Sequence, residues 1–205
     1  MNTLHAKYKV IGITGGVGAG KSTILSYLEQ QYHAAVIRAD EVAARLEEPG
    51  QPCYEPIVRE FGKSFLEADG RLDRKKIAQE VFARPERLQK LNKIVHPAVE
   101  KWIRNEISKE RNRRITAIEA ALLLESGYDQ FCDEVWYIYV PEEVRIRRLM
   151  NSRGYSEEKC RQIMANQLPE SEFRRKCQFL IDNSRQDVQN TYGQIDQIIE
   201  QWGKE

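Results

Sequence analysis

One octapeptide near the start of the chain constrains the fold more than any other feature. Residues 15–22 read GGVGAGKS, which matches the pattern G-x-x-x-x-G-K-[ST]. The preceding segment, KVIGIT (9–14), is short and β-branched like a buried strand, and residues 21–32 carry apolar side chains at helical spacing. A glycine-rich turn between a strand and a helix is typical of a phosphate-binding loop (P-loop), so we expect a nucleoside triphosphate site here.

The residue types in this turn suit the binding of phosphate. Glycines let successive backbone N–H groups approach phosphate oxygens, and the start of the helix adds partial positive charge. Lys21 is expected to contact the β- and γ-phosphates, and the Ser22 hydroxyl to be a ligand of Mg²⁺. ATP and Mg²⁺ are therefore the expected cofactors. The expected nucleotide-binding residues of this segment are Gly16, Val17, Gly18, Ala19, Gly20, Lys21, Ser22 and Thr23.

The rest of the chain reads as strands that alternate with helices. Further strands are expected at AAVI (34–37), ITAIEAALLL (115–124), VWYIYV (135–140) and QFLI (178–181). This alternation predicts an α/β fold of the P-loop NTPase type, with a parallel five-stranded sheet between two helical layers, a helical insertion and a helical lid. The last helix, from about Asp187, carries an apolar stripe that faces a core.

The second and third expected strands are separated by a long segment without strand patterns. Pro56, Pro85 and Pro97 are expected to break it into several helical pieces. We predict a nucleotide-binding core at 1–48, 114–143 and 177–205, a helical acceptor-binding region at 49–113, and an arginine-rich lid at 144–176.

Two features follow from this layout. Ligands of parallel sheets bind at the carboxyl ends of the strands, so Gly15–Ser22, Asp40 and Glu125 are expected to face one crevice. Residues 145–176 hold nine basic residues against four acidic ones. This basic excess is either a solvated face or a surface that neutralises phosphate.

Composition and missing motifs exclude several classes. With 32 Lys and Arg against 31 Asp and Glu, the net charge is +1, which argues against a duplex-binding protein and predicts no nucleic-acid partner. No apolar run approaches the roughly 20 residues that a membrane helix needs, and no signal peptide is visible, so a cytoplasmic protein without a membrane partner is expected. The four scattered cysteines are expected to be reduced thiols. The N-K-x-D and D-x-x-G motifs of regulatory GTPases and the LSGGQ signature of transporter ATPases are absent.

A series of short motifs after the P-loop resembles the dephospho-CoA kinase family over residues 9–184. The motifs are DEVAAR (40–45), EPG (48–50), FG (61–62), DGRLDR (69–74), LNKIVHP (91–97), LLLE (122–125) and IDNS (181–184). The resemblance implies ATP-dependent phosphorylation of the 3′-hydroxyl of dephospho-CoA, which gives coenzyme A and ADP. It also implies a P-loop core, a helical acceptor-binding region and a mobile lid. Dephospho-CoA is then the expected substrate partner, and a monomer or weak homo-oligomer is expected.

The resemblance also implies roles for individual residues. Asp40 matches the acid that orients or deprotonates the acceptor hydroxyl, and its position after the second strand equally suits a helix N-cap. Arg153 resembles the lid arginine that closes over the transferring phosphate, as a catalytic partner of Lys21 and Asp40. Asn183 resembles a residue near the nucleotide base.

The acceptor is expected to contact three residues. Arg45 resembles an acceptor-contacting arginine, or else forms a surface ion pair with Glu41 or Glu48. His96 is either an acceptor ligand or a packing residue. Glu125 either looks into the phosphate crevice or holds a backbone amide or arginine in place.

The sequence departs from the family pattern at a few positions. Arg38 stands where an aspartate is usual, and strand alternation is expected to place it on the same face as Asp40. The other departures are Ala121, Gly154 and Gln178. The alternatives to a dephospho-CoA kinase are another small-molecule or nucleoside monophosphate kinase, and a nucleotide-binding module without activity.

Overall fold

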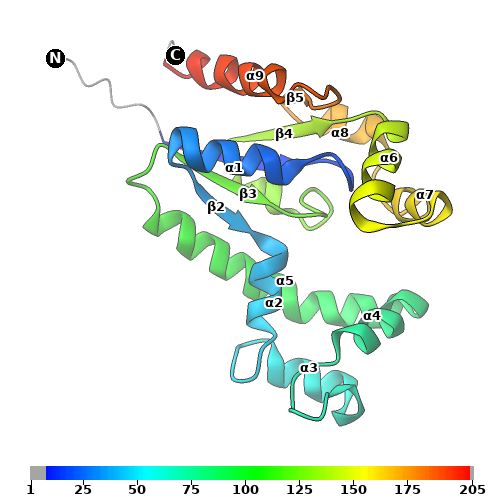
Figure 1. Cartoon of the computed structure of the whole chain (residues 1–205). Helices are drawn as coiled ribbons and strands as arrows, with labels where there is room; N and C mark the ends of the chain where they lie inside the picture. Colours follow the sequence, from blue (N-terminus) through cyan, green and yellow to red (C-terminus); the bar gives the residue numbers. More distant parts are fainter. Residues whose placement is uncertain (1–7, 204–205) are drawn as a thin grey trace. The chain divides into compact units, whose positions relative to one another are not determined.

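The computed structural model describes residues 8–203, which divide into two units (Figure 1). The first unit is built from the segments before Arg38 and after Ser108, and the second from Arg38–Ser108. No helix in the described part of the chain is long and apolar enough to cross a membrane.

The first unit contains a five-stranded sheet with the strand order β2-β3-β1-β4-β5. Its strands are β1 (Lys9–Thr14), β2 (Ala35–Arg38), β3 (Ile115–Glu119), β4 (Glu134–Tyr139) and β5 (Phe179–Asp182). The pairs β1–β3, β1–β4 and β4–β5 are parallel. Together with the helices around it, this sheet confirms the predicted three-layer α/β/α fold.

Strand β1 lies in the middle of the sheet, directly before the glycine-rich turn. Its Ile11 and Ile13 are fully buried. They belong to a core cluster that also includes residues of helix α1 (Lys21–Tyr32) and of the last helix, α9 (Val188–Gln201). Central parallel strands are covered on both faces, which is why KVIGIT is apolar along almost its whole length.

Helices of the first unit follow the strands in turn. They are α1 (Lys21–Tyr32), α6 (Glu142–Arg153), α7 (Glu157–Ala165), α8 (Glu170–Lys176) and α9 (Val188–Gln201), with a short 3₁₀ helix, η2, at Tyr128–Phe131. The Asp187 side chain caps α9 by accepting a hydrogen bond from the Gln189 N–H, at the predicted start of that helix.

The third strand is shorter than the sequence predicts. Strand β3 ends at Glu119, and the chain then turns through residues 121–127. Leu123 and Leu124 are buried there, while the N–H of Ser126 donates to the Leu122 carbonyl. One continuous apolar run therefore contributes to the core first as a strand and then as a turn. Hydrophobic periodicity alone does not distinguish these two conformations.

The second unit is helical. It contains α2 (Ala39–Leu46), α3 (Tyr54–Phe61), a 3₁₀ helix η1 (Lys63–Phe65), α4 (Arg74–Ala83) and α5 (Pro85–Lys109), the last of which ends one residue beyond the unit. Leu66 and Leu72 form an isolated antiparallel bridge between η1 and α4.

The prediction that Pro97 breaks the helical segment is wrong, because Pro97 lies inside α5. An internal proline removes one helical hydrogen bond and costs about 3 kcal/mol. Val95, Val99 and Ile103 are buried on either side of it. Burial of each apolar side chain contributes about 1.5–3 kcal/mol. Packing of this face therefore outweighs the lost hydrogen bond and keeps α5 continuous.

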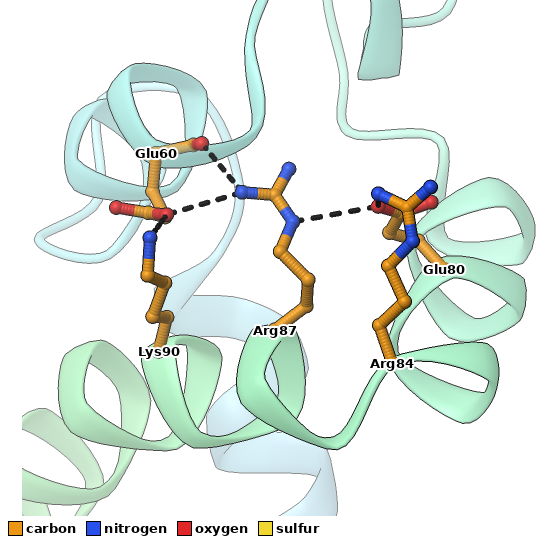
Figure 2. A network of polar contacts seen from close by, with 5 residues as sticks. All are labelled: Glu60, Glu80, Arg84, Arg87 and Lys90. Atoms are coloured by element: carbon orange, nitrogen blue, oxygen red, sulfur yellow. Dashed lines mark hydrogen bonds and ion pairs between the residues drawn. The ribbon is translucent and has the colours of Figure 1, made fainter.

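A network of charged side chains holds α3, α4 and α5 together within the helical unit (Figure 2). Nη1 of Arg87 lies 3.1 Å from both the backbone oxygen and Oε1 of Glu60, and its Nε lies 3.4 Å from Oε1 of Glu80. Lys90 and Arg84 add ion pairs to the same two carboxylates, at 2.7 and 3.0 Å. The guanidinium of Arg87 also stacks on the Phe61 ring, 4.4 Å from its centroid. Arg87, in the first turn of α5, thus connects α3 with α4.

Glu134 joins the start of the sheet to the end of the chain within the first unit. Its buried carboxylate accepts hydrogen bonds from the indole N–H of Trp202 (3.0 Å) and of Trp136 (3.2 Å), and pairs with the ammonium of Lys9. One carboxylate therefore satisfies three donors, from β1, β4 and the residue after α9.

Replacing Glu134 with alanine is expected to lower the free energy of unfolding by about 3–5 kcal/mol, because the change removes the acceptor of two buried indole N–H groups and the carboxylate that pairs with Lys9. Chemical denaturation followed by tryptophan fluorescence measures this loss. Glu200→Ala, an exposed acid near the end of α9, is the control and should change the stability by less than about 0.5 kcal/mol. Equal effects of the two variants would contradict this role of Glu134.

Candidate active site

The predicted turn between β1 and α1 is present, and two glycines explain why. Gly15 has a φ of 147°, and a Cβ there would lie 2.6 Å from the backbone oxygen of Ile138 on the neighbouring strand β4. Gly20 has a φ of 84°, and a Cβ there would collide with the side-chain amide of Asn183. Both positions need glycine because of backbone conformation and because of space. The turn is thus held against β4 and the segment after β5.

The residues that follow the turn leave its open side accessible. Ser22 and Thr23 are exposed in the first turn of α1, whose N–H groups have no partner within the helix. Ala19 N–H donates to the Gly16 carbonyl (3.1 Å), which closes the turn on itself. This arrangement directs the helix N-terminus and a hydroxyl toward the place where a phosphate chain would lie.

Lys21 contacts the backbone of the turn and a carboxylate of the neighbouring strand β3. Its ammonium donates to the Gly15 carbonyl (3.0 Å) and lies 3.7 Å from Oε1 of Glu119, the last residue of β3. Glu119 was not predicted as a site residue, because the apolar run was interpreted as strand up to residue 124 and the acid was expected at Glu125. The signal was available: Glu119 is the only acid within the apolar run 115–124. In the register of the sheet it lies opposite Ile13, immediately before the turn.

Asn183 contacts the P-loop backbone. Its side-chain Nδ2 donates to the Ala19 carbonyl (2.8 Å), and its Oδ1 accepts from the Thr191 hydroxyl (3.1 Å). Its own backbone carbonyl accepts from Nη2 of Arg148 (2.9 Å). The side-chain amide is therefore engaged with the turn itself, a structural role that the sequence did not suggest.

The predicted lid segment contacts the P-loop through Gln167, a residue that no sequence motif marked as functional. Its Oε1 accepts a hydrogen bond from the Val17 N–H (3.0 Å). Arg153, the last residue of α6, is exposed, and so is Glu125 in the turn after β3. The structure thus brings Lys21 and Asn183 to the turn, and leaves Arg153 and Glu125 on the surface of the first unit.

The remaining predicted site residues belong to the second unit. Asp40 lies in the first turn of α2, and the prediction that it caps this helix is wrong. Arg38 occupies the N-cap position, and no side chain caps it. The expectation that Arg38 and Asp40 share one face of a strand is also wrong, because β2 ends at Arg38 and Asp40 lies in a helix. Arg38 Nε instead lies 3.9 Å from Oε1 of Glu41.

Arg45 and His96 lie on α2 and α5. The guanidinium of Arg45 stacks over the Trp102 ring, 4.7 Å from its centroid, which leaves its donor edge available for a partner. Burial lowers the pKa of His96, so the neutral imidazole predominates at pH 7. The placement of Asp40, Arg45 and His96 beside the P-loop stays a prediction.

Comparisons with solved structures define the class of protein. The fold resembles that of shikimate kinase from Acinetobacter baumannii, with a TM-score of 0.55 and 14% identity over 96% of this chain and 95% of that one. A protein of Thermus thermophilus is more similar, with a TM-score of 0.82 and 30% identity over 95% and 97% of the two chains. The fold and the glycine-rich turn are those of a P-loop protein with a three-layer α/β/α architecture.

Sequence comparisons specify the family. The family model for dephospho-CoA kinase matches residues 9–189. The dephospho-CoA kinase of Carboxydothermus hydrogenoformans is 37% identical over 195 residues, which cover 94% of each chain. That of Symbiobacterium thermophilum is 39% identical over 92% of this chain and 79% of its own. The solved dephospho-CoA kinase of Campylobacter jejuni has a TM-score of 0.67 and 25% identity over 93% and 96% of the two chains. The chain belongs to the dephospho-CoA kinase family, as the sequence motifs had indicated.

Removing the Asn183 amide is expected to loosen the P-loop. Asn183→Ala deletes the hydrogen bond to the Ala19 carbonyl, which we expect to weaken ATP binding by about tenfold and to lower the stability by about 1–2 kcal/mol. Titration calorimetry and thermal unfolding measure the two effects. Asn151→Ala, at an exposed position of α6, is the control. Unchanged ATP affinity in Asn183→Ala would show that the turn keeps its shape without this contact.

Proposed function

We propose that the protein transfers the γ-phosphoryl group of ATP to the 3′-hydroxyl of dephospho-CoA and forms coenzyme A and ADP. The hydroxyl oxygen attacks the γ-phosphorus, the bond to the β-phosphate oxygen breaks, and ADP leaves. Membership of the dephospho-CoA kinase family carries this proposal, together with a P-loop whose lysine and helix N-terminus are in place. Phosphoryl transfer depends mainly on positioning and charge stabilisation, which such a site supplies.

Nucleotide and metal are assigned to the first unit. The backbone from Gly16 to Thr23 would surround the phosphates, and Lys21 would contact the β- and γ-phosphates. Mg²⁺ usually takes one or two protein oxygens together with phosphate oxygens and water. The exposed Ser22 hydroxyl and the Glu119 carboxylate suit that requirement, since Glu119 lies beside the P-loop lysine. When bound, the metal would neutralise charge on the phosphates.

Asp40 is the proposed base. A carboxylate in the first turn of α2, directly after β2, suits acceptance of the hydroxyl proton as the bond to phosphorus forms. Arg45 and His96 are the proposed acceptor contacts. The stacking of Arg45 on Trp102 supports this assignment, because a guanidinium held by an aromatic face keeps its hydrogen-bond donors free for phosphate.

Arg153 and Glu125 complete the proposal. Arg153 would reach the transferring phosphate when the segment 144–176 closes, which its exposed position at the end of α6 permits. Glu125 would contact the acceptor from the exposed turn after β3. A cytoplasmic location is part of the proposal, supported by the four free thiols of Cys53, Cys132, Cys160 and Cys177.

A panel of acceptors tests the proposed reaction. ADP release from MgATP is measured with dephospho-CoA, with AMP, with shikimate and without an acceptor, and the product with dephospho-CoA is identified by mass. ADP formation that depends on dephospho-CoA and yields coenzyme A is expected. Preference for AMP or shikimate would favour another small-molecule kinase. Binding of ATP without turnover on any acceptor would indicate a nucleotide-binding module.

Asp40→Asn is expected to lower turnover by roughly two to four orders of magnitude and to leave ATP affinity unchanged, because it removes the proton acceptor and keeps the size of the side chain. Steady-state kinetics with dephospho-CoA and calorimetry with ATP measure the two quantities. The matched control is Glu41→Gln, which neutralises the adjacent and exposed acid. Normal turnover of Asp40→Asn would refute the assignment of the base.

A further inference from the structure

A cavity of about 380 Å³ opens beside the P-loop within the first unit. One wall is Gly16 of the P-loop, a second is the end of β4 with Tyr137, and a third is the segment from α7 to α8 with Gln167. Arg145, in the first turn of α6, and Arg161 of α7 contribute the two guanidinium groups of its lining. Such a cavity is large enough for a phosphate group and its surroundings.

The two arginines of this cavity differ in their partners. The guanidinium of Arg161 is held by Glu142 (2.8 Å), Glu143 (3.1 Å) and Glu157 (2.8 Å). The side chain of Arg145 forms no hydrogen bond or ion pair with any residue among 8–203, and its Nε is buried without an acceptor. The cavity lining also holds Glu142 and Glu170, which pair with Arg161 (2.8 Å) and Arg174 (2.6 Å). Because these carboxylates are engaged with other arginines, and a half-buried cation without an ion-pair partner is costly, the cavity suits an anion beside Arg145.

Arg145 lies directly against the phosphate-binding turn. A Cβ added to Gly16 would collide with its Nη1, and one added to Gly18 would lie 3.1 Å from its backbone oxygen. The start of α6 is thus packed on the turn. The next residue of the turn, Val17, donates its N–H to Oε1 of Gln167. Gln167 also lines the cavity, so this hydrogen bond joins the segment between α7 and α8 to the P-loop next to Arg145.

The position of Lys21 indicates which phosphate would meet Arg145. In P-loop enzymes this lysine contacts the β- and γ-phosphates. Here its ammonium lies 3.0 Å from the carbonyl of Gly15, the residue before the glycine that Arg145 covers. A triphosphate bound to Lys21 would then have its terminal group nearest to Gly16 and Arg145. Building on the proposed use of ATP, we propose that Arg145 binds the γ-phosphate from the cavity side of the P-loop and so favours ATP over ADP.

The test compares the affinities of the protein for ATP and ADP. Calorimetry at fixed Mg²⁺ is carried out on the unmodified protein, on Arg145→Gln and on Arg147→Gln, which removes an exposed charge from the same helix outside the cavity lining. Arg145→Gln is expected to weaken ATP binding about tenfold or more and ADP binding less than about twofold. Arg147→Gln should leave the ratio of the two affinities unchanged.

The other outcomes overturn the inference. An unchanged ratio in Arg145→Gln, or an equal loss for ATP and ADP, would show that Arg145 does not contact the terminal phosphate. Arg145→Lys provides a second measurement if the glutamine variant does not fold: it keeps the charge without the fork of donors, so the preference for ATP should fall only in part. If the preference for ATP does not fall at all in Arg145→Lys, the fork of guanidinium donors is not the contact. Failure of the unmodified protein to bind either nucleotide would refute the proposed function as well.

Discussion

The conformation of the turn between β1 and α1 is the constraint on which the site depends. A glycine-rich turn has many accessible conformations, so contacts with other segments must fix its backbone if its N–H groups are to keep one arrangement. Here the carbonyl of Ile138 lies against Gly15, and the amide of Asn183 binds the carbonyl of Ala19. Because β1 lies between β3 and β4 in the sheet, the start of the turn has little freedom to move.

Charge around this turn is arranged in two different ways. Lys21 has a carboxylate partner in Glu119, and Arg161 has three. Such pairs hold side chains in place and reduce the net field that they exert on a ligand. Arg145 pairs with no carboxylate among residues 8–203, so its charge is offset less than theirs and acts on the adjoining cavity. Arg161, with its carboxylate partners, therefore maintains the structure of the lid segment, whereas Arg145 is available to an anion.

Local pattern was sufficient to predict the sheet and the P-loop. Strand β1 and helix α1 begin and end as expected, because a buried strand, a glycine cluster and an apolar helical face are each visible in a few residues. The prediction failed where the pattern was ambiguous. Apolar residues 120–124 were taken for strand although they turn, and Pro97 was taken for a break although buried neighbours keep α5 helical.

Side-chain partners were harder to predict than elements. Glu119 and Gln167 reach the turn from strands and loops that are distant in sequence, and nothing local marks them as neighbours of Lys21 or Val17. Asn183 was singled out by resemblance alone, and its contact with Ala19 depends on the register of β5 in the sheet. Roles of this kind follow from tertiary packing and cannot be derived from one segment of the chain.

The contact between Asn183 and Ala19 also has a consequence for how the protein is made. During synthesis the glycine-rich turn leaves the ribosome long before Asn183, whose side chain binds the backbone of that turn. The neighbours of β1 in the sheet, β3 and β4, also come from the second half of the chain. Contacts of such long sequence separation form late and slow folding. The phosphate-binding loop therefore cannot reach its final conformation before β5 and Asn183 have been synthesised.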